Sequence, residues 1–424
     1  MKQTEIGLIP DDWEVKRFDE LFSISTETVP LADINQRCYV GTENMMQDKK
    51  GVAENTIELK YQNVREYRKD DILISNIRPY LKKIWFADKD GGCSTDVLVF
   101  RKIRNTDNAN FLFKIVSDDR FFNIVNDNAV GTKMPRGDKN IIKQVLFAIP
   151  TDKEEQQRIA KALSDVDALI STTEKLIQKK KNIKQGTMQN LLTGKKRLPG
   201  FAKSTRTKMT ELGEIPEDWE VKSLGEIFEF RPNNTFTRDC LNDSKGKYQN
   251  VHYGDVLIKY PSILDCSKET IPFINEGINV KFSKYGIVEG DIIIADTAED
   301  ETVGKVVEIF NLGEKKIVSG LHTFLCRKIT DDFAPKWLGY FMNQAIFHNQ
   351  LLPFITGTKV SAISRTAIQN VKVLMPSKEE QTAIANILSS MDKEIETLNT
   401  KLEKYHNLKT AMMQQLLTGR IRLI

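Results

Sequence analysis

The sequence has little of what membrane proteins, disulfide-bonded proteins and metalloproteins need. Its 424 residues contain no apolar run as long as a membrane span, and the opening MKQTEIGLIPDDW lacks the apolar core of a secretion signal. The five cysteines and four histidines are scattered without paired spacing, so the sequence predicts no disulfide framework and no zinc site. The expectation is a cytoplasmic protein that holds no metal.

Motifs for ATP hydrolysis and for methyl transfer are also missing. The Gly-Lys pairs that begin at residues 194, 246 and 304 continue with Lys, Tyr and Val, so none completes a phosphate-binding loop. The segment NIRPY at residues 76–80 has one residue too many for the NPPY motif of adenine methyltransferases, and no glycine-rich S-adenosylmethionine motif follows a strand. Methyl transfer and ATP hydrolysis are therefore assigned to partners.

A nuclease signature is suggested by PDDWEVK at residues 10–16. Nuclease chemistry needs an Asp and a Glu-x-Lys pair on neighbouring strands to hold a metal ion, whereas here the residues are almost contiguous. The second copy of this segment has Glu217 in place of Asp11. Trp13 and its counterpart Trp219 are better interpreted as anchors of a strand that opens each domain.

Length, composition and charge are ordinary for a globular protein and do not single out one functional class. A chain of this length suggests two or more domains, and 40% apolar with 28% charged residues is ordinary for a globular protein. The formal net charge of +4 permits nucleic-acid binding without demanding it.

What is present is a long internal repeat. Residues 154–194 and 379–419 align at a constant offset of 225, which pairs Glu154 with Glu379. Neither copy contains proline, and each is predicted to form one long helix, roughly 60 Å for about 40 residues at 1.5 Å per residue.

The ends of these helices carry stop and start signals. Thr151 and Ser377 each stand three residues before a glutamate, which predicts a capping box. Gly194 and Gly419 suit a left-handed stop.

Apolar residues recur along both helices in alternating steps of four and three, which is the pattern of a coiled-coil seam. The seam is interrupted in the first copy by Thr173, Lys180, Lys184 and Thr187 and in the second by Lys409. The predicted interface residues are Ile159, Leu163, Val166, Ile170, Ile177 and Leu191 in the first helix and Ile384, Leu388, Met391, Ile395, Leu398, Leu402, Tyr405, Met412 and Leu416 in the second.

The repeat extends to the segments in front of the helices. IGLIPDDWEVKRF at residues 6–18 corresponds to LGEIPEDWEVKSL at residues 212–224. The interiors between these openings and the helices differ much more, although both contain a buried strand (71–75 and 291–295), a second strand (96–101 and 322–327), an amphipathic helix, a Gly-Thr-Lys loop and a final strand before the long helix.

The predicted fold is α+β, with two globular domains in tandem, each followed by a long helix. If each domain begins and ends at nearby points, the helices run antiparallel as a coiled coil with approximate two-fold symmetry. The predicted parts are residues 1–152 (first domain), 153–194 (first helix), 195–208 (basic linker), 209–377 (second domain), 378–419 (second helix) and 420–424 (tail).

Basic and polar residues after the first buried strand and in the Gly-Thr loops are candidates for contact with DNA phosphates and base edges. A solvated surface is the alternative, because most Lys and Arg residues lie there in any protein. The candidate residues are Arg78, Lys82, Lys83, Thr132, Lys133, Arg136, Thr358, Lys359, Ser361 and Arg365.

With these motifs the chain resembles the specificity subunit of type I restriction–modification systems. The resemblance rests on the IP-x-DWE-V openings, the KEEQ segments before the helices and the LLTG-x-x-RL segments at their ends, each present twice. It implies two target recognition domains that each read one half of a bipartite double-stranded DNA site. It further implies two modification subunits that carry S-adenosylmethionine and methylate adenine, and restriction subunits that use ATP and Mg, with no cofactor on this chain.

A coiled-coil scaffold that binds only proteins is the alternative hypothesis. The contrast between nearly identical framing segments and divergent interiors separates the two, because two readers of different half-sites require such a contrast and a scaffold does not.

Overall fold

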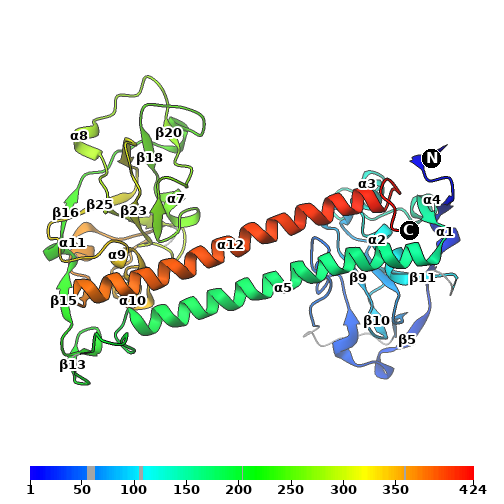
Figure 1. Ribbon diagram of the computed structural model, residues 1–424, viewed down its shortest axis with the longest axis horizontal. Coiled ribbons are helices and arrows are strands. Elements are labelled where there is room, and N and C mark those ends of the chain that lie inside the picture. The colour runs from blue at the N-terminus through cyan, green and yellow to red at the C-terminus, as the bar shows by residue number, and fades with distance from the viewer. Residues whose placement is uncertain (55–62, 105–107, 203, 358–359) are drawn as a thin grey trace. The chain divides into compact units, whose positions relative to one another are not determined.

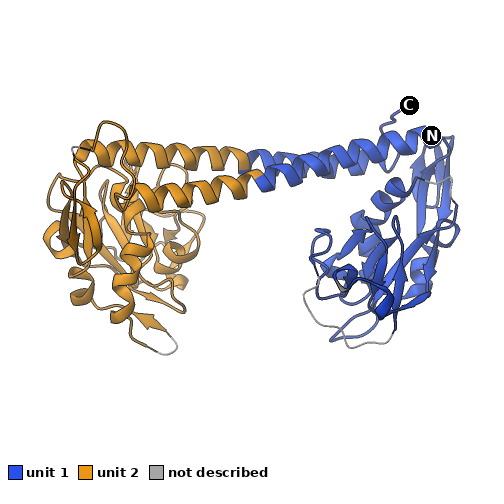
Figure 2. Cartoon of the chain, turned by 90° about the horizontal axis from the view of Figure 1, so that it is seen from below, with its two compact units in different colours: residues 1–175, 399–424 blue, residues 176–398 orange. Residues whose placement is uncertain are grey.

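The computed structural model falls into two compact units that each contain parts of both long helices (Figure 2). Unit 1 is residues 1–175 with 399–424, and unit 2 is residues 176–398. The structure describes the whole chain except residues 55–62, 105–107, 203 and 358–359. None of the helices in this described part combines the length and the apolar character that a membrane span requires.

In its described residues, unit 1 contains two four-stranded sheets and four short α-helices in addition to its share of the long helices (Figure 1). One sheet has the order β4 (Phe22–Ser25), β11 (Val97–Lys102), β8 (Ile72–Ser75) and β9 (Ile84–Phe86). The other has the order β5 (Thr28–Pro30), β7 (Asn63–Tyr67), β10 (Gly91–Cys93) and β6 (Tyr39–Val40). Two further pairs join β1 (Lys2–Thr4) to β2 (Gly7–Ile9) and β3 (Trp13–Arg17) to β12 (Leu146–Pro150), and the short helices are α1 (Phe18–Leu21), α2 (Ala109–Val116), α3 (Asp119–Asp127) and α4 (Lys139–Gln144).

Unit 2 follows the same plan with additions. Its larger sheet has the order β16 (Phe228–Arg231), β25 (Thr323–Lys328), β21 (Ile292–Ala295), β23 (Val306–Phe310) and β19 (Ile263–Asp265). Its smaller sheet has the order β17 (Leu241–Asn242), β20 (Phe273–Ile274), β18 (Gln249–Val251) and β24 (Ile317–Ser319). The remaining pairs are β13 (Thr207–Thr210) with β14 (Gly213–Pro216), β15 (Glu220–Ser223) with β27 (Lys372–Met375) and β22 (Thr297–Ala298) with β26 (Ser361–Ala362), and the short helices are α6 (Leu224–Ile227), α7 (Tyr253–Ile258), α8 (Phe282–Tyr285), α9 (Trp337–Phe341), α10 (Ala345–Leu351) and α11 (Arg365–Gln369).

The central strands of the larger sheets are buried because their side chains are apolar on both faces. β8 and β21 are buried at every position, as the unbroken runs of Ile and Leu predict. Each strand is preceded by an aspartate that pairs with an arginine of the neighbouring strand, Asp71 with Arg101 and Asp291 with Arg327. The buried carboxylates are thereby satisfied at the same place in both units.

The amphipathic segment after the second strand is two helices rather than one. In unit 1 the chain breaks at Ser117 between α2 and α3, because the Asp118 side chain accepts a hydrogen bond from the backbone of Arg120 and starts a new helix. Unit 2 divides in the same way into α9 and α10. The prediction of a single helix was wrong, because apolar periodicity continues across the break.

The long helices are α5 (Lys153–Leu191) and α12 (Lys378–Leu416). Both are followed by a glycine with positive φ, 72° at Gly194 and 68° at Gly419, as predicted. The predicted capping boxes are confirmed only in part. In α12 the Ser377 hydroxyl accepts a hydrogen bond from the backbone N–H of Glu380 at 3.3 Å, as predicted, but the Glu380 side chain bonds Trp219 and Arg197 instead of completing the box. In α5 the predicted cap is wrong. Asp152, not Thr151, accepts hydrogen bonds from the first turn of α5, and the Thr151 hydroxyl donates to the carbonyl oxygen of Asp12.

Most of the predicted seam lies in the interior of its own unit. The buried residues are Ile159, Leu163, Val166, Ile170, Ile177, Leu191, Ile384, Leu388 and Leu416. The half-buried residues are Met391, Ile395, Leu398, Leu402, Tyr405 and Met412, all in α12.

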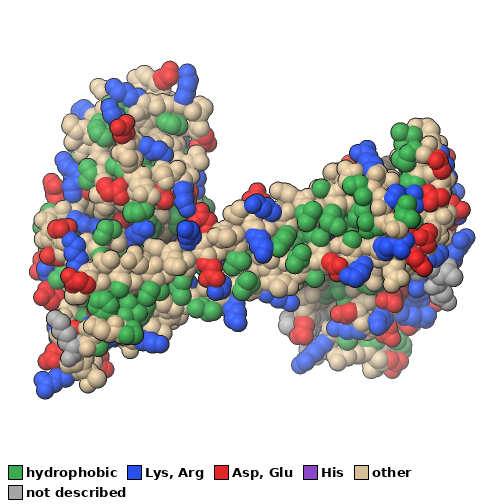
Figure 3. Space-filling view, in the orientation of Figure 1, with side chains coloured by type: hydrophobic (Ala, Val, Ile, Leu, Met, Phe, Trp, Pro, Cys, Tyr) green, Lys and Arg blue, Asp and Glu red, His purple; other side chains and the backbone are tan. Residues whose placement is uncertain are grey.

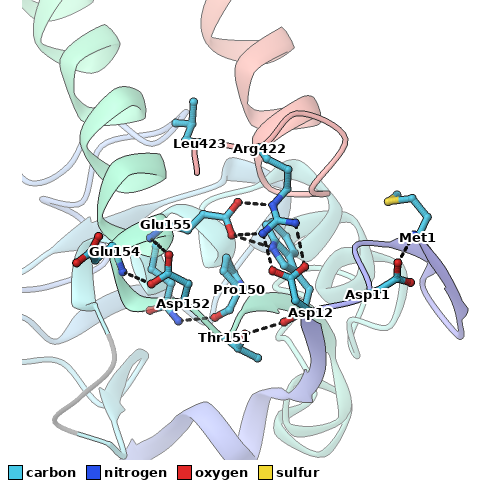
Figure 4. A network of polar contacts seen from close by, with 12 residues as sticks. Met1, Asp11, Asp12, Pro150, Thr151, Asp152, Glu154, Glu155, Arg422 and Leu423 are labelled. Carbon is cyan, nitrogen blue, oxygen red and sulfur yellow. Dashed lines mark hydrogen bonds and ion pairs between the residues drawn. The ribbon is translucent and has the colours of Figure 1, made fainter.

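The repeated motifs meet in a cluster that we call the dock (Figure 4). In unit 1 the indole N–H of Trp13, which is fully buried, donates to Glu155 in the first turn of α5 at 3.1 Å. The guanidinium of Arg422, from the tail that follows α12, donates to both oxygens of Glu155 at 2.5 and 2.7 Å and to both oxygens of Asp12 at 2.9 and 2.7 Å. These carboxylates raise the pKa of Arg422.

Unit 2 has the same dock with the helices exchanged. Trp219 donates to Glu380 at 3.2 Å, and Arg197, which follows α5, donates to Glu380 at 2.6 and 2.7 Å and to Asp218 at 2.8 and 3.1 Å. Glu380 is therefore committed to the dock and does not return to cap its helix. The basic linker is structured where it supplies Arg197.

A glycine at each helix end makes room for the dock. A Cβ atom on Gly419 would lie 2.5 Å from Pro10, and one on Gly194 would lie 2.6 Å from the ring of Pro216. The positive φ angles also disfavour any side chain at these positions. The LLTG and IP segments recur together because they form one contact.

A second repeated contact joins the helices within each unit. In unit 1, Lys409 of α12 lies 2.7 Å from Asp167 of α5, and the buried Lys114 of α2 donates to the same carboxylate at 2.6 Å. Burial alone would raise the pKa of Asp167, but the two ammonium groups outweigh it and hold the pKa below its ordinary value.

In unit 2, Lys184 of α5 forms an ion pair with Asp392 of α12, and Tyr340 of α9 donates to the same carboxylate at 2.8 Å. Lys184 and Lys409, which break the predicted seam, thus pair with equivalent aspartates. Only the third partner differs between the units, Lys114 in one and Tyr340 in the other.

Candidate nucleic-acid interface

Two loops of unit 1 are joined at the end of the buried strand β8. The N–H of Asn76 donates to the carbonyl oxygen of Asp96 at 2.9 Å, and the N–H of Gly137 donates to that of Asn76 at 3.2 Å. Val130 and Arg136 exchange both of their backbone hydrogen bonds at 2.9 Å. The loop after β8 and the Gly-Thr-Lys loop therefore form one surface.

Unit 2 repeats this backbone arrangement bond for bond. The N–H of Asp296 donates to the carbonyl oxygen of His322 at 3.1 Å, and the N–H of Ile363 donates to that of Asp296 at 2.9 Å. Thr356 and Ala362 exchange hydrogen bonds at 3.0 and 2.9 Å. We call this arrangement the platform of each unit. It comprises Asn76, Asp96, Val130, Arg136 and Gly137 in unit 1 and Asp296, His322, Thr356, Ala362 and Ile363 in unit 2, with the residues next to them in the described chain.

The side chains on the two platforms differ although the backbones agree. Asn76 of unit 1 is replaced by Asp296 in unit 2, and Asp96 is replaced by His322. Arg136, whose side chain is 54% exposed and lies 3.2 Å from Asp96, is replaced by Ala362. A constant backbone with variable polar side chains is what a family of recognition surfaces needs.

The predicted DNA-binding residues of unit 1 gather on this surface from two segments. The N–H of Arg78 donates to the carbonyl oxygen of Pro135 at 2.8 Å, which places the two predicted groups beside each other. The side chains of Arg78, Thr132, Lys133 and Arg136 are exposed.

Lys82 and Lys83 have partners inside the unit. Lys82 donates to Asp119 at 2.6 Å, and Lys83 donates to the carbonyl oxygen of Thr42 at 2.6 Å. Burial alone would raise the pKa of Asp119, but Lys82 and Lys49 hold it below its ordinary value. These two lysines are engaged by partners elsewhere in unit 1 and are less available to DNA than Arg78.

In unit 2 the predicted residues are placed unevenly. Thr358 and Lys359 lie outside the described residues. Ser361 is half-buried in β26, where it pairs with Ala298. Arg365 starts α11, and its guanidinium stacks over the ring of Phe230 at 5.4 Å, so this arginine packs against its own domain.

Sequence reasoning did not select Asp96, Asp296, Thr297 or His322 as candidates. A signal was available, since the alignment of the two second strands sets Asp96 beside His322. Both stand immediately before a strand, at the point where the chain leaves the turn for the sheet.

Charge alone does not single out this surface. On the face that Figure 3 displays, basic and acidic side chains are interspersed over each unit. Within the described part of the chain, no three His, Cys, Asp or Glu side chains are grouped as a metal ion would require. The platform is therefore distinguished by its backbone geometry and not by its charge.

The fold and the repeated motifs define a DNA-specificity protein, and comparison with known families agrees. The model of the type I restriction modification DNA specificity domain matches residues 10–185 and again residues 216–405. The chain belongs to this family, whose members recognise bipartite DNA sites for type I restriction–modification complexes.

Relatives match along nearly the whole chain. A type I restriction enzyme specificity subunit, MjaVIII, of Methanocaldococcus jannaschii is 28% identical over 424 residues, which covers 98% of this chain and 94% of the relative. A second subunit of that organism, the putative MjaX specificity subunit, is 25% identical and covers 99% and 96%.

Solved structures share the fold. The S subunit of a type I restriction–modification system from M. genitalium superposes with a TM-score of 0.58 at 15% identity and covers 98% of both chains. A chain from a study of complex assembly and conformational transition of the type I R-M system superposes with a TM-score of 0.56 at 19% identity, covering 98% of this chain and all of the other.

Proposed function

We propose that the chain reads a bipartite double-stranded DNA site through its two platforms, one half-site for each unit. The observation that carries the proposal is the pair of identical backbone arrangements with different polar side chains. The major groove presents a distinct pattern of donors and acceptors for each base pair, so surfaces that differ in this way select different sequences.

The two long helices pair in opposite directions as a coiled coil in this proposal. The support comes from ion pairs between the helices inside the units. In unit 2, Lys180 pairs with Glu394 and Lys184 with Asp392. Along these pairs the number rises in α5 as it falls in α12, which is the order of antiparallel neighbours. Lys409 with Asp167 in unit 1 continues the same order. The result is an approximate two-fold repeat within one chain.

The same repeat suits two copies of one partner. The docks hold each domain on the long helices through equivalent residues, so two identical modification subunits can bind the two units in equivalent ways. S-adenosylmethionine, ATP and Mg are assigned to the modification and restriction subunits, and this chain acts without catalysing a reaction. The purified chain alone should neither methylate nor cut DNA.

The test is adenine methylome sequencing of a host that carries the modification subunit with and without this chain. The expected result is a methylated motif with two defined halves and an undefined spacer that appears only when the chain is present. An unchanged methylome would contradict the proposal, and so would a single uninterrupted motif. The latter outcome would leave one platform without a role.

A further inference from the structure

The platform of unit 2 carries a polar cluster that is organised around Asp296. The Thr297 hydroxyl donates to Oδ1 of Asp296 at 2.8 Å and lies 3.3 Å from Nδ1 of His322. Nδ1 of His322 lies 3.4 Å from the same carboxylate oxygen, and the ring of Tyr253 meets the His322 ring edge-on at 5.3 Å. We call Asp296, Thr297, His322 and Tyr253 the tip cluster.

The backbone holds His322 in an unfavourable conformation. Its φ angle is 54°, in the left-handed region that glycine tolerates best. The His322 side chain is nevertheless 46% exposed, so the imidazole is not retained to fill the core. His322 therefore presents an exposed imidazole on the platform.

We propose that the tip cluster contacts base edges of the half-site that unit 2 reads and that Asp296 selects a base with an exposed amino group. A carboxylate accepts hydrogen bonds and donates none, so it favours the amino group of cytosine or adenine over the carbonyl of guanine or thymine. Nδ1 of His322 faces Asp296, which leaves Nε2 as the ring nitrogen for DNA.

The equivalent surface of unit 1 carries a guanidinium that unit 2 lacks. Arg136 presents a guanidinium in place of Ala362, and its partner Asp96 occupies the position of His322. A guanidinium only donates, and its two-pronged geometry matches the O6 and N7 acceptors of guanine. Unit 1 is therefore expected to select a guanine through Arg136, a contact that unit 2 cannot make because Ala362 stands in its place.

This inference rests on the proposed function, and one methylome experiment tests both. The chain and its modification partner are expressed with the wild-type sequence and with Asp296→Asn, which keeps the size of the side chain but adds a donor. The matched control is Lys245→Ala, which removes a side chain that is 79% exposed and pairs with Glu276 on the same unit.

The expected result for Asp296→Asn is a loss of at least about tenfold in discrimination at one position of one half-site. The other half-site and the spacer should stay as in the wild type. Arg136→Ala should change the opposite half-site, and Lys245→Ala should change neither. If a bipartite wild-type motif is unaltered by Asp296→Asn, the inference fails and the proposed function stands. If the wild-type chain yields no bipartite motif, the proposed function itself fails.

If Asp296→Asn abolishes methylation, a second measurement tests the inference. The purified complex with Asp296→Asn is then offered duplexes that differ in turn at each position of the half-site, and its melting temperature is compared with that of the wild type. An altered preference at one position supports the inference. An equal loss on all duplexes contradicts it, because a base contact weakens discrimination at its own position. His322→Ala provides an independent variant with the same expected pattern.

Discussion

The two units share the central hydrogen bonds of the dock, whereas they share a platform only in its backbone. Trp13, Glu155 and Arg422 have exact counterparts in Trp219, Glu380 and Arg197, with hydrogen bonds of nearly the same length. Arg136 has only an alanine in its place. The dock thus holds each domain on the helices in the same way, while the platform is free to diverge.

Each dock is also shared between the halves of the sequence. The arginine of unit 1 comes from the end of the second helix, and the arginine of unit 2 follows the first helix. A change near the C-terminus is therefore expected to act on the N-terminal domain. This exchange gives predictions that separate a two-unit repeat from two independent domains.

The largest effect is expected from removing a dock tryptophan. Trp13 is fully buried, so Trp13→Ala should lower the free energy of unfolding by about 3–5 kcal/mol. Trp219→Ala is the matched change in unit 2 and should cost a similar amount, because Trp219 is equally buried. Thermal melting with limited proteolysis locates the affected unit. A large cost in one unit and none in the other would show that the docks are not equivalent.

A smaller loss is expected from Arg422→Ala. Glu155 is 1% exposed and would lose its cationic partner, but Arg422 is 23% exposed, so the cost should be about 2–3 kcal/mol, below that of breaking a fully buried pair. Arg422→Lys should recover only part of the lost stability, because an ammonium group cannot bond two carboxylates as a guanidinium does. The affinity of each variant for each of the two DNA half-sites is then measured.

The domain specificity of that loss is the sharper test. Arg422→Ala should weaken recognition of the half-site that unit 1 reads, and Arg197→Ala should weaken the other. If Arg422→Ala impaired the half-site of unit 2 instead, the exchanged assignment of the docks would be wrong.

An intermediate effect that depends on pH is expected at Asp167. Its folded pKa is lowered by Lys114 and Lys409, so it stabilises the fold above the unfolded pKa of about 3.9, and this contribution is lost as the pH falls through the folded value. Asp167→Asn should cost about 1 kcal/mol at neutral pH, since the carboxylate is partly exposed. Melting curves of both proteins should converge in strong acid. A constant difference at every pH would contradict the ion-pair origin.

The smallest effect on stability is expected from Lys133→Ala, because the side chain is exposed. If Lys133 contacts a phosphate, the variant should bind all DNA sequences more weakly and its salt dependence should fall by about one unit of slope. Binding isotherms at several salt concentrations measure this. Relaxed preference at one base position would instead assign Lys133 to a base edge.

Much of this architecture could be predicted from the sequence, because the internal repeat provides two copies of each element that can be aligned with each other. The long helices, the glycine stops and the buried strands follow from periodicity and spacing. The break at Ser117 could not be predicted, because apolar residues continue across it. That Asp118 caps a new helix is visible only from its hydrogen bond to the backbone of Arg120 in the folded chain. The cap of α5 was misassigned for a similar reason, as Thr151 and Asp152 are both competent and the partner at Asp12 is remote in sequence.

The candidate interface was predictable in part. The exposed residues Arg78 and Arg136 were selected because they are basic and stand in loops. Lys82 could not be distinguished from them, because its partner Asp119 comes from a different segment. Asp296 and His322 were missed because acidic and neutral residues are rarely read as DNA contacts. Their significance depends on backbone bonds that only the folded chain displays.

Exchange of one domain interior tests the central claim most directly. Residues 20–149 are replaced by the corresponding interior of another family member, and the methylome of a host carrying the chimera and its modification partner is sequenced. The account predicts that one half of the recognised site changes while the other half and the spacer are retained, because both docks and both helices are untouched. A change in both half-sites, or in neither, would contradict the account of two separate readers on a repeated dock.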